Sequence, residues 1–122
     1  NICRDHFEKR LPSRQASADF YRSQLRANVI LPPAGYQSNA YLYACTHEPA
    51  RRDAWTAAYQ AAGIGFATTY PGSISEQAGA REHLKHQVGG EQAVRLSRML
   101  LNPPLFPYMT DAELAEVVQV EP

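Results

Sequence analysis

The chain has 122 residues, enough for one domain with a hydrophobic core and too few for two ordinary domains. Its 12 basic and 12 acidic residues balance, so no overall field favours nucleic acid or an acidic membrane surface as a partner. A hydrophobic fraction of 44% indicates a globular rather than a disordered protein, and no apolar run approaches the roughly 18 residues of a membrane span.

The chain starts at Asn1 without an initiator methionine or a signal-like apolar run, which favours a fragment of a longer, cytoplasmic protein. Its two cysteines, Cys3 and Cys45, do not make a disulfide framework. Cys45 ends an apolar run and is predicted to be a small buried side chain. No histidine or second cysteine stands at ligand spacing from it, so no metal site is expected there.

The first predicted helix covers residues 14–27, after a connecting segment over residues 1–13. Ser13 is available as its N-cap. Residues 28–39 contain consecutive prolines and a glycine, which indicates an irregular or extended connection. The apolar face of the helix repeats at helical spacing through Ala18, Tyr21 and Leu25.

A buried strand is predicted over residues 41–45, which are short, apolar and rich in aromatic side chains. The next helix runs from Pro49, tolerated in a first turn, to Ala62, and Gly63 supplies its C-terminal stop. A short strand is then expected over residues 66–70. The core face of the helix is predicted to consist of Trp55, Ala58, Tyr59 and Ala62.

Three further elements are expected in the second half of the chain. Residues 75–87 favour a helix for part of their length, and Gly89-Gly90 ends it. Residues 91–99 read as another helix, and residues 100–101 as a brief strand. Short strands separated by helices predict an α+β fold, a small two-layer domain with a short, mainly antiparallel sheet and covering helices.

A proline-rich corner over residues 102–107 precedes the last predicted helix, residues 111–120. Three prolines remove backbone donors and fix φ, so neither a helix nor a central strand can continue through the corner. Thr110 and Glu113 have the spacing of a capping box. The apolar face of this helix is predicted to consist of Leu114, Val117 and Val118.

The residues that could carry chemistry do not form a self-contained catalytic site. His83 and His86 lie three residues apart, as metal ligands on a helix can, but no further ligand completes a set, and a solvated polar face is the preferred interpretation. Gly63-Ile64-Gly65 lacks the third glycine of a dinucleotide turn. Gly72-Ser73 does not form a nucleophile elbow.

Three stretches in order, residues 38–43, 62–71 and 93–110, resemble the C-terminal small domain of the DegT/DnrJ/EryC1/StrS family of pyridoxal-phosphate-dependent sugar aminotransferases. The first is Ser-Asn-Ala-Tyr-Leu-Tyr, and the second contains Gly-Ile-Gly before Thr-Thr-Tyr-Pro. The third joins Ala-Val-Arg-Leu-Ser to the proline corner and Met-Thr. The resemblance covers residues 14–120 and implies that residues 14–122 form the small domain of a fold-type I pyridoxal phosphate enzyme.

The resemblance also implies a function for the intact protein. Family members move an amino group from glutamate to a nucleotide-linked keto sugar for polysaccharide or antibiotic synthesis, and act as homodimers. Their cofactor is bound by a lysine of a large domain, and neither Lys9 nor Lys85 matches that lysine motif. This chain alone is therefore expected to be inactive. A sugar dehydratase of the same family and a non-catalytic binding module that keeps the fold are the alternatives.

The substrate-facing residues implied by the resemblance depart in part from the family pattern. Ser38, Thr69 and Ser75 stand where many members carry histidine. Hydroxyl groups can hydrogen-bond a sugar but cannot carry protons near neutral pH. The predicted substrate-binding residues are Ser38, Tyr41, Thr69, Tyr70 and Ser75.

Overall fold

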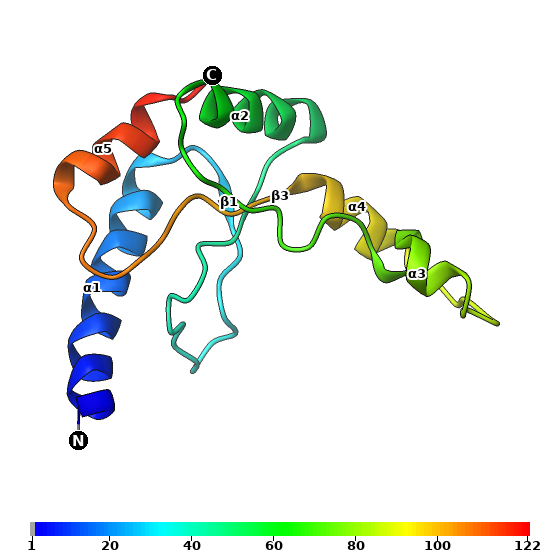
Figure 1. Ribbon diagram of the computed structural model, residues 1–122, viewed down its shortest axis with the longest axis horizontal. Helices are drawn as coiled ribbons and strands as arrows, with labels where there is room; N and C mark the ends of the chain where they lie inside the picture. The colour runs from blue at the N-terminus through cyan, green and yellow to red at the C-terminus, as the bar shows by residue number, and fades with distance from the viewer. Residues whose placement is uncertain (1) are drawn as a thin grey trace.

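The computed structural model describes residues 2–122, without the side chains of residues 2, 3, 5 and 6. A three-stranded antiparallel sheet in the order β1-β2-β3 has helices packed around it, which confirms the predicted α+β class (Figure 1). Across the described residues, no helix has both the length and the apolar character needed to cross a bilayer. The elements are α1 (Ile2–Gln24), β1 (Asn28–Val29), β2 (Cys45–Thr46), α2 (Pro49–Ala61), a 3-10 turn (Ile74–Glu76), α3 (Ala78–Arg81), α4 (Glu91–Met99), β3 (Leu100–Leu101) and α5 (Asp111–Gln119).

The centre of the sheet is β2, which pairs with both other strands. Cys45 lies opposite Val29 on one side and opposite Leu101 on the other. Its side chain is fully buried, and its thiol donates a hydrogen bond to the Leu101 carbonyl at 3.3 Å. The prediction of a small buried cysteine is confirmed, while the side chain of Cys3 lies outside the described residues. Burial raises the pKa of the Cys45 thiol to about 12.

The helices cover the sheet with the apolar faces expected from their spacing. Helix α1 ends at Gln24, before the predicted end at residue 27, and the predicted core residues Ala18, Tyr21 and Leu25 are all buried. In α2, Trp55 and Tyr59 are fully buried and Ala58 is half-buried, but Ala62 lies beyond the helix and is exposed, so the predicted core face was wrong at Ala62. Leu114 and Val117 of α5 are buried against this core, and Val118 packs at its edge.

The first helix begins much earlier than predicted. α1 starts at Ile2 and continues through Pro12, so residues 2–13 are helical and Ser13 is not an N-cap. A proline inside a helix removes one backbone donor, but hydrogen bonds on either side can keep the helix continuous. The Ser13 hydroxyl instead accepts a hydrogen bond from the backbone N–H of Tyr108 at 2.7 Å. This contact ties α1 to the chain just before α5.

Two predicted strands are shorter than expected. The strand placed at residues 41–45 is confined to Cys45 and Thr46, and the chain turns at Ala40, which has a φ of 49°. The strand placed at residues 66–70 is reduced to one antiparallel bridge between Ala67 and Asn102. The next amide that could extend it, that of Thr69, donates to the Asn102 side chain instead of to a neighbouring strand.

Residues 74–99 form an arm that projects away from the core, with α3 and α4 along it (Figure 1). Within the predicted helix at 75–87, only a 3-10 turn and the four-residue α3 are helical. Gly89 and Gly90 both have positive φ, which confirms the predicted break. The predicted helix at 91–99 and the brief strand at 100–101 are confirmed as α4 and β3.

The proline corner packs against α1 and leads into α5. The hydroxyl of the buried Tyr21 donates to the Pro104 carbonyl at 2.8 Å, which fixes the corner on the core. The predicted capping box is present: the Glu113 N–H donates to the Thr110 hydroxyl at 3.3 Å, and the Glu113 carboxylate accepts from the Thr110 N–H at 2.7 Å. Helix α5 then ends at Gln119, one residue before the predicted end.

Candidate functional site

The five predicted site residues fall on two segments. Ser38 and Tyr41 lie on the loop between β1 and β2, and Thr69, Tyr70 and Ser75 lie on the turn between α2 and α3. In Figure 1 the first segment hangs below the sheet, and the second passes beside β3 toward the arm. The structure therefore places the predicted residues in two groups rather than in one cluster.

The first group is held in a defined conformation by its own side chains. The Ser38 hydroxyl oxygen accepts the Ala40 N–H at 3.0 Å, and the Asn39 side chain accepts the Tyr41 N–H at 3.1 Å. Ala40 is buried at this turn, whereas the Tyr41 side chain is 65% exposed. The guanidinium of Arg14, on α1, lies 5.7 Å from the centre of the Tyr41 ring. Such a cation over an aromatic face attaches the loop to the helix.

A groove of about 470 Å³ runs between α1 and this loop, and Ser38 lines it. The Gln15 amide donates to the Ser38 carbonyl at 3.3 Å, and Asp19 pairs with Arg22 at 2.8 Å along the same wall. The groove thus joins a polar helix face to an apolar loop. The apolar wall contains Val29, Ile30, Leu31, Pro32, Pro33 and Leu42.

The second group combines an exposed aromatic side chain with an anchored backbone. The Tyr70 side chain is 77% exposed and follows Thr69 through a cis peptide bond. The Thr69 N–H donates to the Asn102 side-chain oxygen at 2.9 Å. The backbone is therefore fixed where the chain presents Tyr70 to solvent.

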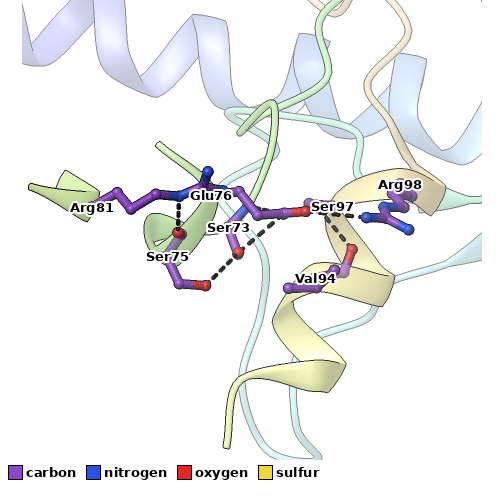
Figure 2. A network of polar contacts seen from close by, with 7 residues as sticks. All are labelled: Ser73, Ser75, Glu76, Arg81, Val94, Ser97 and Arg98. Atoms are coloured by element: carbon purple, nitrogen blue, oxygen red, sulfur yellow. Dashed lines mark hydrogen bonds and ion pairs between the residues drawn. The ribbon is translucent and has the colours of Figure 1, made fainter. Parts of the chain in front are cut away.

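Ser75 belongs to a polar network on the arm (Figure 2). Its hydroxyl lies 3.0 Å from that of Ser73, which donates to Glu76 at 3.0 Å. The Glu76 carboxylate also accepts the Ser73 N–H at 2.9 Å and the Arg98 guanidinium at 3.2 Å. The hydrogen bonds from Ser73, backbone first, and then Arg98 hold the pKa of Glu76 below its usual range. These contacts connect the turn to α4.

A smaller cavity of about 240 Å³ adjoins this network. Arg52 lines it and donates through Nε to the Arg98 carbonyl at 3.0 Å. Because Arg98 in turn pairs with Glu76, the charges around the cavity largely satisfy one another. These contacts can hold the turn over residues 68–76 in place, and the charged groups that line the cavity are already paired with one another.

Asn102 joins the two groups and was not identified from the sequence as a site residue. It is 3% exposed, and its side-chain amide donates to the Tyr43 carbonyl at 3.2 Å while its oxygen accepts from Thr69. Its backbone exchanges two hydrogen bonds with Ala67. An asparagine before two prolines signals a turn, but nothing in that pattern reveals its distant partners.

The histidine pair has no ligand set around it in the described part of the chain. His83 and His86 are both exposed, on the stretch that follows α3. Among the residues that the structure describes, no group of three or more histidine, cysteine, aspartate or glutamate side chains could hold a metal ion.

Comparison with known proteins gives one family. Residues 5–120 match the sequence profile of the DegT/DnrJ/EryC1/StrS aminotransferase family. No curated protein matches the chain.

Several solved structures share the fold. DesV of S. venezuelae, solved with a ketimine intermediate, has a TM-score of 0.85 and 20% identity, over 98% of this chain and 33% of that chain. The aminotransferase TlmJ from Streptoalloteichus hindustanus has a TM-score of 0.77 and 21% identity, over 90% of this chain and 30% of that chain. A DegT DnrJ EryC1 StrS aminotransferase from Brucella abortus has a TM-score of 0.70 and 24% identity, over 93% and 30%. The chain spans about a third of the length of these structures.

Proposed function

The chain belongs to the DegT/DnrJ/EryC1/StrS aminotransferase family, and we propose that residues 14–122 are the small, substrate-facing domain of a pyridoxal-phosphate-dependent sugar aminotransferase. The observation that carries this proposal is the family match over residues 5–120, in a chain that spans a third of the solved relatives. The substrates of the intact enzyme would be a nucleotide-linked keto sugar and glutamate. We further propose that it acts as a cytoplasmic homodimer in amino-sugar and surface-polysaccharide synthesis.

The role of this chain would be to bind and orient the sugar. Tyr41 and Tyr70 offer exposed aromatic faces, against which sugar rings can pack. The hydroxyl groups of Ser38, Thr69 and Ser75 can exchange hydrogen bonds with sugar hydroxyls. Because the carbonyl of Tyr43 and the amide of Thr69 share one buried side chain, the two segments are held at a fixed spacing, which favours a pre-organised surface.

The residues of this chain do not fit the cofactor by themselves. Pyridoxal phosphate, when bound, supplies the electron sink for amino transfer and is held through a lysine. Lys9 lies on the exposed side of α1 and Lys85 on the exposed stretch after α3, and neither lines the two cavities described above. We therefore propose that the cofactor is held by residues outside this chain.

The cofactor assignment predicts that the 122-residue chain forms no specific adduct with pyridoxal phosphate. The measurement is absorbance after mixing, followed by borohydride reduction and peptide mass spectrometry. Low, unselective labelling of both lysines is expected, because exposed lysines are similar to one another in reactivity. Stoichiometric, saturable reduction at one lysine would contradict the proposal.

The substrate role is tested by titrating the chain with UDP-glucose while recording ¹H–¹⁵N spectra. We expect chemical-shift changes around Tyr41 and Tyr70, and weaker binding by about five- to tenfold in the Tyr70→Ala variant. Tyr108→Ala is the matched control, since Tyr108 is also exposed but lies just after the proline corner, where its backbone N–H donates to Ser13 of α1. Equal loss in both variants, or no shifts at either segment, would count against a substrate surface here.

A non-catalytic binding module is the second candidate. It is favoured by Thr69 and Ser75, which replace the family's histidines with groups unable to carry protons near neutral pH. The reading frame upstream of Asn1 separates the candidates. A large domain with a Schiff-base lysine supports the aminotransferase, a large domain with another residue at that position supports a dehydratase, and a nearby start codon supports the module.

A further inference from the structure

Arg14 differs from most other arginines of the chain in being half-buried and without an ionic partner among the described residues. Its guanidinium makes no hydrogen bond to the parts of the chain that the structure describes, and its Nε is buried without a partner there. An unpaired buried donor is costly, so such groups usually serve a ligand, a water molecule or a partner. The other half-buried arginine has partners: Arg52 donates to the Arg98 carbonyl and pairs with Asp53.

The Arg14 guanidinium lies over the ring of Tyr41, 5.7 Å from its centre. Tyr41 is in turn fixed by the hydrogen bond from its amide to Asn39. The guanidinium therefore rests against an ordered turn of the loop, and its terminal N–H groups have no hydrogen-bond partner among the described residues. A planar fork that is fixed in advance binds an oxyanion with little further loss of side-chain entropy.

A second donor stands on the same loop. The Ser38 hydroxyl oxygen accepts the Ala40 amide, and its proton has no acceptor among the described residues. Ser38 is also held to α1, because its carbonyl accepts from Gln15, the neighbour of Arg14. The same stretch of α1 therefore contacts the loop twice, through Arg14 at Tyr41 and through Gln15 at Ser38.

We propose that Arg14 and Ser38 form a phosphate-binding site, with Tyr41 as the adjoining aromatic face. Arginine pairs with two oxygens of a phosphate group at once, and a serine hydroxyl can donate to a third. An exposed aromatic ring next to a phosphate fork suits a nucleotide, whose base or sugar can pack on it. This inference rests on the proposed function, under which the ligand is the diphosphate group of the nucleotide-linked sugar.

The test is a titration of the 122-residue chain with inorganic pyrophosphate. Binding is monitored in ¹H–¹⁵N spectra of the backbone amides and of the arginine Nε–Hε groups. We expect saturable shifts at the Arg14 side chain and the Tyr41 amide. Arg14→Gln should weaken binding by about tenfold or more, and Arg14→Lys by a few-fold, because lysine keeps the charge but not the fork. Arg10→Gln is the matched control: Arg10 is exposed on the same helix, one turn away, and its loss should leave binding unchanged.

Each outcome decides the inference. Unchanged pyrophosphate binding in Arg14→Gln, or equal losses in Arg14→Gln and Arg10→Gln, overturns the site. Saturation by glutamate at a lower concentration than by pyrophosphate overturns the phosphate assignment in favour of a carboxylate. If the Arg14→Gln variant does not fold, as a loss of spectral dispersion would show, pyrophosphate binding is compared in Arg14→Lys and Ser38→Ala instead. Arg14→Lys keeps the positive charge of α1, and Ser38→Ala leaves α1 unchanged.

A parallel titration with UDP-glucose separates this inference from the proposed function. UDP-glucose binding that is lost in Arg14→Gln supports both. Pyrophosphate binding at Arg14 without any UDP-glucose binding supports the phosphate site and overturns its assignment to a sugar nucleotide. UDP-glucose binding that persists unchanged in Arg14→Gln overturns the inference and leaves the proposed function standing.

Discussion

The side-chain amide of Asn102 connects the two loops that carry the candidate site. It reaches one loop through the Tyr43 carbonyl and the other through the Thr69 amide, from a position that is almost fully buried. A buried amide with both ends occupied specifies one arrangement, because any slip of either loop would leave a polar group unpaired. The relative placement of Tyr41 and Tyr70 depends on this one residue.

Replacing Asn102 by alanine should reduce the free energy of unfolding by about 2–4 kcal/mol, since two backbone groups lose their partners in the interior. Urea denaturation followed by circular dichroism measures this change. Asn39→Ala is the control, because Asn39 also bonds a backbone amide but is exposed, and about 1 kcal/mol or less is expected there. An equal loss of unfolding free energy in the two variants would show that the buried hydrogen bonds of Asn102 stabilise the fold no more than the exposed one of Asn39.

The buried imidazole of His47 is expected to make the stability of the core depend on pH. Its ring is 5% exposed and stacks on Trp55 with centres 5.5 Å apart. Burial, and then the nearby Arg51, lower its pKa below the ordinary 6.5, while Glu121 acts in the opposite direction. The neutral ring is therefore the form that the folded state favours.

Because the folded-state pKa of His47 is below the unfolded value, its contribution to stability is complete above the unfolded pKa of 6.5 and is lost as the pH falls toward the folded value. We expect the urea midpoint to drop between about pH 7.5 and 5.5, and His47→Gln to flatten that drop. Fluorescence of Trp55, the single tryptophan, reports unfolding. His83→Gln, at an exposed position, should leave the slope intact; a flattened slope there would contradict the assignment.

Some of these single-residue roles could be predicted from the sequence and others could not. The burial of Tyr21 follows from local helical spacing, and the burial of Cys45 follows from its apolar neighbours. The bridge made by Asn102 joins positions 59 and 33 residues away, and no local pattern encodes such partners. The unpaired state of Arg14 likewise depends on where the β1–β2 loop folds back on α1.

Among the elements, α5 shows how strongly a local signal can fix a boundary. Thr110 and Glu113 exchange the hydrogen bonds of the capping box at the predicted position, directly after the proline corner. The hydrogen bonds from Thr110, backbone first, also hold the pKa of Glu113 below its ordinary value. Helix α5 is therefore started by its own sequence and held by the burial of Leu114 and Val117.

Substitution of Thr110 by alanine should destabilise the domain by about 1 kcal/mol, because one N-terminal amide of α5 loses its acceptor. Thr110→Ser keeps the hydroxyl oxygen and should recover most of that loss. The comparison is made by urea denaturation, with hydrogen exchange of the first turn of α5 as a local readout. A Thr110→Ser variant as unstable as Thr110→Ala would mean that the methyl group, not the cap, is responsible.

The helices were better predicted than the strands, for a physical reason. Helical hydrogen bonds are local, so spacing and end signals define α2, α4 and α5 to within one residue. Strand pairing depends on distant segments. The strand β2 pairs with β1 and β3 over Cys45–Thr46, and the Asn102 side chain takes the Thr69 amide that could have extended the bridge at Ala67. The early start of α1 shows the converse error, since the N-cap predicted at Ser13 lies inside a helix that begins at Ile2.

Across the whole molecule, burial is concentrated around the sheet and decreases along the arm. The aromatic rings of Trp55 and Tyr59 pack 5.3 Å apart in the core, and Tyr59 lies 6.0 Å from Phe66. In contrast, residues 81–93 are all exposed, and Ser97 is the only buried residue of α4. Arg52 of α2 donates to the Arg98 carbonyl near the end of the arm. The Glu76–Arg98 pair joins the 3-10 turn to α4 within the arm itself (Figure 2).

We therefore expect the arm to open independently of the core. Amides of α3 and of residues 82–90 should exchange with solvent at least about 100-fold faster than those in the middle of α2. Hydrogen exchange followed by mass spectrometry measures both in one experiment. Glu76→Gln should accelerate exchange at the base of the arm while leaving α2 unchanged; equal protection of the arm and α2 in the unmodified chain would contradict this division.

The burial of Cys45 gives the molecule a built-in reporter of its folded state. Alkylating reagents react with the thiolate, and this thiol is both shielded in the central strand and held protonated by a pKa of about 12. Modification at this position therefore requires the three strands to separate. Mass spectrometry of the peptide that contains it would count unfolded copies in a cell extract, without purification or an added dye, and would show whether a given substitution acts on folding or on the surface.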